Sequence, residues 1–246
     1  MIANSHNFQL KYEENKLLKA AFEASTKSEK ITLLERFYGN RKERESLIGD
    51  IIQCEYMTET VEGMAVYVQC QALRQLSEEK YQEECNKYIS VISKLNETQF
   101  DIRMISYYVG AILLLTAYEV GLHIEHSLSN AEIPVSDIIC CQLNPTKADN
   151  IFENKIGMIM EDVIASRKKA ILEADNREMI EVEGKYYISG YDPMNMIRYS
   201  DKILCSNFIR LTNSLTGSAK NLFGTTILYM VPGSKNEVFR YKTKRP

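Results

Sequence analysis

Three short stretches of the chain combine residue types that can do chemistry. Residues 59–68 hold two glutamates one helical turn apart, Glu59 and Glu62. Residues 107–111 begin with a tyrosine, and residues 123–126 read His-Ile-Glu-His. Carboxylates and imidazoles bind metal ions, and a phenol can donate a hydrogen bond to a developing oxyanion. These stretches therefore predict metal-dependent or acid–base chemistry.

The first two stretches each place a glycine inside a helical pattern. Gly63 follows Glu62 directly, and it costs about 1 kcal/mol of helix propensity relative to alanine. Gly110 follows Tyr107 by three residues, so the two lie on nearly the same helix face. This pattern predicts that two helices could pack through these glycines, with the glutamate and the tyrosine facing a shared cavity. On the residues alone we favour the alternative of a solvated glutamate, a packing glycine and a core tyrosine.

The sequence Val-Glu-Gly-Met-Ala-Val-Tyr at residues 61–67 resembles the E-G-x-A-x-Y helix of gluzincin metallopeptidases, which include the aminopeptidase N family. The resemblance implies that Glu62 is the third ligand of a zinc ion. Tyr107-x-x-Gly110-Ala111 is similar to the downstream Y-x-x-G-A segment of these enzymes, which implies that Tyr107 stabilises the oxyanion. In such a site Glu59 would orient a ligand from one turn away.

Further segments resemble a less characterised bacterial group of peptidase-like proteins. Residues 14–18 match an E-N-x-L-L helix start, and the arginine-bearing segment 36–44 follows in the same order. Residues 191–195 resemble the turn that opens the small β lobe of that group. The resemblance covers most of the chain and implies an α+β fold, with a helical bundle followed by a small β-rich lobe.

One required motif is missing. Gluzincins hold zinc with two histidines in H-E-x-x-H, whose glutamate is the general base. The histidines here are His6, His123 and His126, and no two are four residues apart. Either the chain begins after that motif, which we favour, or the protein is a degenerate relative. A complete member would bind zinc and cleave a peptide or protein substrate, whereas for this chain we expect no bound zinc and no peptidase activity.

Two other hypotheses stay open. The protein could be a non-catalytic helical binding or scaffold module, in which case Glu62 would point to water or into a closed ion pair. It could instead be a metal-dependent enzyme that uses His123 and His126, which would need a further carboxylate nearby. The i,i+3 spacing of these histidines is a weak zinc signature. They follow Gly121, where a helix should end, and a helix C-terminus favours histidine.

The elements that would position these residues fall into two groups. Helical periodicity predicts helices at residues 12–24, 26–38, 41–76, 77–95, 100–120 and 146–175, the third being one long helix or two nearly collinear ones. Residues 179–188 alternate around Glu183-Gly184 and predict a β-hairpin, with further strands at 203–212, 225–231 and 238–241. We expect an incomplete helical peptidase-like domain at 1–176 and a β-rich lobe at 177–246.

Composition limits the class of partner. The net charge of −3 and pI near 5.8 argue against a nucleic-acid partner, because phosphate binding needs a basic surface. The most apolar stretch, residues 109–117, is too short to cross a bilayer, so we expect no membrane partner. The six cysteines show no spaced framework, and free thiols fit a reducing cytoplasm.

Overall fold

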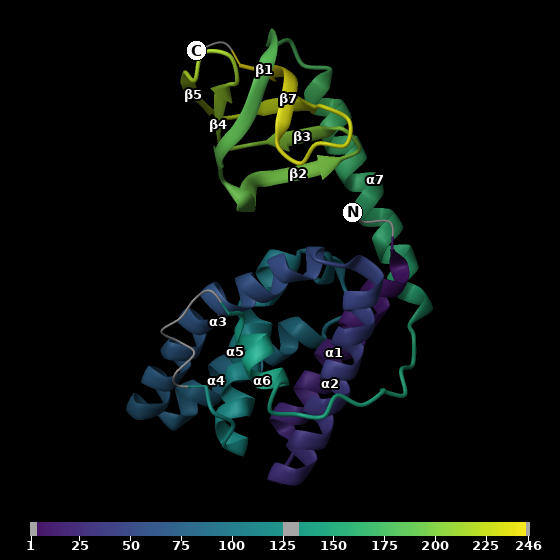
Figure 1. Ribbon diagram of the computed structural model, residues 1–246, viewed down its shortest axis with the longest axis vertical. Coiled ribbons are helices and arrows are strands. Elements are labelled where there is room, and N and C mark those ends of the chain that lie inside the picture. Colours follow the sequence, from purple (N-terminus) through teal and green to yellow (C-terminus); the bar gives the residue numbers. More distant parts are fainter. Residues whose placement is uncertain (1–3, 125–132, 245–246) are drawn as a thin grey trace. The chain divides into compact units, whose positions relative to one another are not determined.

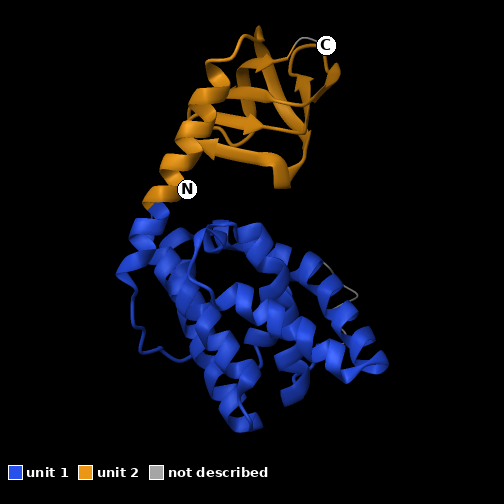
Figure 2. Ribbon diagram, turned by 180° about the vertical axis from the view of Figure 1, so that it is seen from behind, with its two compact units in different colours: residues 1–160 blue, residues 161–246 orange. Residues whose placement is uncertain are grey.

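The computed structural model describes residues 4–124 and 133–244. The chain divides into two compact units, residues 1–160 and 161–246, which Figure 2 colours separately. Helices fill the first unit, and an antiparallel sheet fills most of the second. This order confirms the predicted α+β class.

The helical unit is built from six α-helices and the start of a seventh in its described part. They are α1 Ser5–Glu23, α2 Lys27–Ile48, α3 Ile51–Leu76, α4 Glu78–Ser93, α5 Ile102–Val120, α6 Val135–Cys140 and α7 Asn154–Asp175 (Figure 1), with the 3₁₀ turn Glu97–Phe100 before α5. The side chains of Asn4, Thr26, Ser77 and Asp101 each accept a hydrogen bond from a backbone N–H of the following first turn. Such caps satisfy donors that a helix start leaves free, and they fix where these four helices begin.

The core of the helical unit is centred on α5. Its middle is apolar on every side, and residues such as Val109, Ile112 and Leu114 are fully buried. A helix without a polar face belongs inside a bundle, as the sequence predicts. Among the described residues, no helix is both long and apolar enough to span a bilayer.

Two expected helix boundaries are wrong. The break expected between residues 38 and 41 is absent, because α2 continues through Gly39 to Ile48. Of the two alternatives for residues 41–76, the structure shows two helices: α2 ends before Gly49, whose φ of 58° an L side chain rarely adopts, and α3 begins at Ile51. The helix expected from residue 146 begins only at Asn154. The N–H of Thr146 donates instead to the carbonyl of Glu35 at 3.0 Å, so this segment pairs with α2 and does not coil on itself.

The β unit is a single seven-stranded antiparallel sheet in the order β2-β3-β6-β7-β1-β4-β5. Its strands are β1 Ile180–Tyr191, β2 Met196–Tyr199, β3 Lys202–Cys205, β4 Phe208–Asn213, β5 Ala219–Phe223, β6 Thr226–Met230 and β7 Glu237–Thr243. Ile203 on β3 and Leu222 on β5 lie far apart in the strand order but share one buried cluster. The sheet is therefore curled around a common core, as Figure 1 shows.

The predicted hairpin at residues 179–188 is wrong, because β1 runs straight through it. The register between β1 and β7 shifts between Glu183 and Tyr186, so Gly184 lies at a bulge and not at a turn. A Cβ at Gly184 would lie 2.7 Å from the ring of Tyr186, so the glycine makes room for that ring. Glycine between alternating residues marks a bulge as readily as a turn, and here a partner strand on each side keeps β1 extended.

The boundary between the compact units lies within α7, whereas the sequence placed it at residue 176. The last residue of α7, Asp175, accepts hydrogen bonds from Lys202 at 2.6 Å, from Lys242 at 2.7 Å and from Tyr229. Burial opposes ionisation of this carboxyl, but the three donors hold the pKa of Asp175 well below its usual range. These contacts attach the C-terminal half of α7 to the sheet.

Candidate functional site at the contact of α3 and α5

Helices α3 and α5 touch through their two glycines. A Cβ built on Gly63 would lie 2.6 Å from the Cα of Gly110. A Cβ on Gly110 would lie 2.3 Å from the carbonyl oxygen of Glu59. Both distances are far below a van der Waals contact, so the two backbones meet directly and neither position has room for a side chain. The prediction of two helices packed through glycines is confirmed.

Beside this contact, Glu62 and Tyr107 converge on a third side chain, Arg103. The Arg103 guanidinium donates to the Glu62 carboxylate and lies 3.4 Å from the Tyr107 hydroxyl. Arg103 and Tyr107 are four residues apart on α5, and the guanidinium lies 5.8 Å from the centre of the tyrosine ring. The acid and the phenol therefore meet as expected, but a cation stands where the sequence predicts a shared cavity.

The Glu62–Arg103–Tyr107 cluster is half-exposed. The side chains of Glu62 and Arg103 keep 26% and 37% of their accessible surface. Partial burial raises the pKa of Tyr107, the hydrogen bond with Glu62 raises it further, and Arg103 opposes both. At neutral pH the phenol therefore keeps its proton and can donate a hydrogen bond.

The third predicted site residue, Glu59, belongs to a different cluster. Six charged side chains from α1, α2 and α3 pack together out of contact with water: Lys11, Glu14, Arg41, Arg44, Glu55 and Glu59. Arg41 binds both carboxylate oxygens of Glu59, at 2.6 and 2.7 Å. Arg44 binds Glu55 at 2.6 Å and Glu14 at 2.9 Å. Glu59 therefore holds α3 to α2. Both of its carboxylate oxygens are bound by Arg41, so Glu59 does not orient Glu62 as the sequence predicted.

This buried cluster is electrically balanced, with three cations and three carboxylates. Burial alone would raise the pKa of Glu55, but Arg44 and Lys11 outweigh it and hold that pKa well below its usual range. At Glu14 burial wins over the attraction of Arg44 and Lys11, and the pKa is raised. Each of these charges needs its partner, because an unpaired charge buried away from water strongly lowers the stability of the fold.

Sequence reasoning missed both Arg103 and the buried cluster. Arg103 was detectable, because it lies one turn before Tyr107 on the same face of a predicted helix. The resemblance placed Glu14 and the 36–44 segment in the right order, but periodicity alone treats such residues as a solvated face. Their pairing depends on how three helices pack, which no single helix pattern contains.

The histidines do not join either cluster in the described part of the chain. His6 lies on α1, and its Nε2 is 3.1 Å from a carboxylate oxygen of Glu43. At His123 the backbone N–H and carbonyl both bond to the side chain of Gln142. Glu125 and His126 lie outside the described residues.

Across residues 4–124 and 133–244, no three His, Cys, Asp or Glu side chains are grouped as metal ligands. A shallow depression lies at the N-terminal end of α2, between Thr26, Glu29 and Arg36, and its lining does not include Glu62 or Tyr107. Comparison of the chain with protein-family models, with curated proteins and with solved structures finds no match.

Proposed function

We propose that the helical unit is a gluzincin-like metallopeptidase domain whose residues, in this chain, do not carry out zinc-dependent hydrolysis. The observation that supports the likeness is the convergence of Glu62 and Tyr107 beside the Gly63–Gly110 contact. These are the two residues that the E-G-x-A-x-Y and Y-x-x-G-A segments single out, and they come from helices far apart in sequence.

The lack of hydrolysis is supported by the donor set around Glu62. Tetrahedral zinc needs three protein ligands in a catalytic site, drawn from imidazole, thiolate and carboxylate groups. The group next to the Glu62 carboxylate is instead the guanidinium of Arg103, a cationic group with donors only, which cannot ligate a metal ion. Glu62, Arg103 and Tyr107 therefore do not form a zinc-binding set, and the positive charge beside Glu62 is that of Arg103.

A second candidate is a non-catalytic helical binding module, which the exposed face of α3 favours. Val61 and Val68 are 56% and 57% exposed, and Ala65 between them is also exposed. Residues 63–73, about three turns of α3, contain no charged side chain, so the exposed side of this part of the helix is uncharged, which is unusual for a helix in contact with water. Apolar side chains at this spacing could receive an apolar peptide segment.

The peptidase proposal is tested by incubating the chain with zinc and a mixed peptide library, followed by mass spectrometry of the products. We expect no cleavage above that of a protein-free sample. Cleavage that a chelator stops and Glu62→Ala abolishes would overturn the proposed inactivity. Glu83→Ala is the matched control, because Glu83 is an exposed glutamate on a different helix, α4.

Peptide binding separates the two candidates, measured as the change in fluorescence anisotropy of labelled library peptides. If the metallopeptidase-like cluster receives the peptide, Glu62→Ala or Tyr107→Phe should weaken binding, because each removes a polar contact. If the apolar face receives it, Val68→Asp should weaken binding while Tyr107→Phe has no effect. An absence of binding would leave neither candidate with a peptide ligand.

A further inference from the structure

The two compact units carry opposite charge, although the chain as a whole is weakly acidic. Residues 1–160 hold 16 Lys and Arg against 23 Asp and Glu, a formal net charge of −7. Residues 161–246 hold 14 against 10, a net charge of +4. Residues 202–236 include no Asp or Glu at all. The β unit is therefore basic, and four of its seven strands, β3 to β6, lie in this acid-free stretch.

One face of the sheet in this unit is open and carries aromatic, cationic and amide groups. On β4 and β5 the residues Ile209, Leu211 and Leu222 point into the core, so their neighbours along the strands point outward. We call the outward set the β4 face, and it consists of Tyr187 on β1, Phe208 and Arg210 on β4, and Asn221 and Phe223 on β5.

The register of the strands places these side chains next to one another. Phe208 is opposite Phe223, and their ring centres are 5.4 Å apart. Arg210 is opposite Asn221 on one side and Gly190 on the other. The rings and the guanidinium therefore form one continuous surface across three strands.

Gly190 leaves space on β1 for the side chains of its neighbours on β4. A Cβ at Gly190 would lie 3.3 Å from the Cβ of Arg210 and 3.8 Å from the ring of Phe208. Because β1 has no side chain here, the stem of Arg210 and the ring of Phe208 lie over its backbone. A flat ligand could therefore approach the rings and the guanidinium together.

The groups of the β4 face are available for a ligand. Phe223 is 70% exposed and Tyr187 is 39% exposed. Within the part of the chain that the structure describes, Arg210 forms no ion pair, and neither does the exposed Lys185, which lies two residues before Tyr187 on the same side of β1. Two carboxylates border this face: Glu237 is opposite Tyr187, and Asp192 lies beside Phe208, to whose carbonyl its backbone N–H donates. An anionic ligand would thus be drawn toward β4 and β5.

We propose that the β4 face binds single-stranded nucleic acid. Unpaired bases stack on exposed aromatic rings, while arginine and lysine contact the phosphates. The exposed amide of Asn221 beside the rings can bond base edges, a contact that a simple polyanion does not need. This proposal departs from the expectation drawn from whole-chain charge, because that sum conceals the positive charge of the β unit.

The test is fluorescence anisotropy of the full chain with a labelled oligothymidylate of about 15 nucleotides, a length that covers one such face. We expect saturable binding that weakens with salt, with a log–log slope of about −1.4 if Arg210 and Lys185 each contact one phosphate. Loss of one stacking ring in Phe223→Ala should weaken binding about tenfold, and Arg210→Ala should also lower the slope.

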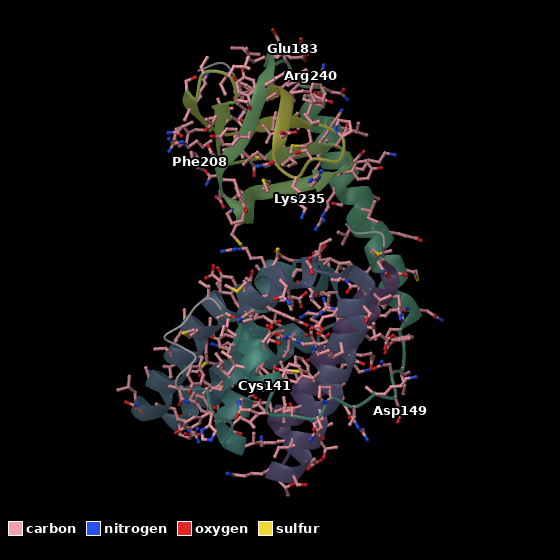
Figure 3. All side chains as sticks on the ribbon, in the orientation of Figure 1. Cys141, Asp149, Glu183, Phe208, Lys235 and Arg240 are labelled. Atoms are coloured by element: carbon pink, nitrogen blue, oxygen red, sulfur yellow. The ribbon has the colours of Figure 1, made fainter. Side chains whose placement is uncertain are left out.

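The control variant is Lys235→Ala. Lys235 belongs to the same acid-free stretch but lies away from Phe208 in Figure 3, so its loss should leave affinity within about twofold. No binding at low salt would overturn the proposal. Equal binding by heparin with no effect of Phe223→Ala would also overturn it, because that result describes a non-specific polyanion surface. Circular dichroism of each variant confirms that the exposed substitutions leave the sheet folded.

Discussion

Glu59 and Glu62 lie one turn apart on α3, yet they occupy opposite environments. Glu59 is fully buried and accepts hydrogen bonds from both terminal nitrogens of the Arg41 guanidinium. Glu62 is a quarter exposed and shares Arg103 with Tyr107. Both are carboxylate–arginine pairs between neighbouring helices, so the difference between them is the amount of water that reaches each pair.

This difference in water access distinguishes a pair that stabilises the fold from a pair that a ligand can reach. A buried pair that loses one partner leaves a charge with no water to stabilise it, whereas a half-exposed pair can be rehydrated. Groups that must meet a ligand also have to reach solvent, which Glu62 does and Glu59 does not. The comparison therefore assigns Glu59 to stability and leaves Glu62 as the residue of the candidate site.

The largest expected effect is on folding stability when one partner of the buried cluster is removed. Glu59→Ala leaves Arg41 without its carboxylate and should lower the free energy of unfolding by about 3–5 kcal/mol. The matched change Glu62→Ala should lower it by less than about 1 kcal/mol. Urea denaturation of both variants measures the contrast, and equal losses would remove the distinction between the two pairs.

The glycine contact predicts the next largest effect. Gly63→Ala and Gly110→Ala each force a Cβ into the opposing backbone and should destabilise the helical unit by about 1–3 kcal/mol. Gly157→Ala on α7 is the control, because a Cβ there meets nothing within 4 Å and should stabilise by up to about 1 kcal/mol. If all three changes stabilised the protein, the two helices could not be in backbone contact.

The buried cluster also predicts how the stability of the protein depends on pH. The folded-state pKa of Glu55 lies below its usual value of 4.5. Its contribution to folding stability is therefore fully present above pH 4.5 and is lost as the pH falls below that value. The stability gap between the wild type and Glu55→Gln should therefore narrow below pH 4.5. The pKa of Glu14 is raised, so its contribution to folding stability grows as the pH falls, opposite to that of Glu55. Glu14→Gln should therefore make the loss of stability in acid steeper. Unfolding curves at several pH values measure both slopes, and a constant gap for Glu55→Gln would contradict this electrostatic account.

The sequence was most informative where one element carries the whole signal. The apolar circumference of α5 predicted its central position, and Gly63 and Gly110 predicted a backbone contact. Both features depend on residues within one helix and on the cost of glycine there. The convergence of Glu62 with Tyr107 was also expected from their position relative to these glycines.

The sequence was least informative where several elements decide the outcome together. Glu183-Gly184 is compatible with a turn or a bulge, and the pairing of β1 with both β4 and β7 selects the bulge. Likewise, Arg44 is an ordinary polar residue on α2 until α1 and α3 bury it against Glu14 and Glu55. Tertiary pairing made these choices, and a single-helix or single-strand pattern does not contain it.

The most direct test of the candidate site is the pKa of Tyr107, measured by NMR with ¹³C-labelled tyrosine and assigned with Tyr107→Phe. Glu62 raises this pKa and Arg103 lowers it. If the three side chains meet as described, Glu62→Gln should move the pKa of Tyr107 down toward its usual value, and Arg103→Ala should move it up. A Tyr107 pKa that stays unchanged in both variants would contradict the convergence of Glu62, Arg103 and Tyr107.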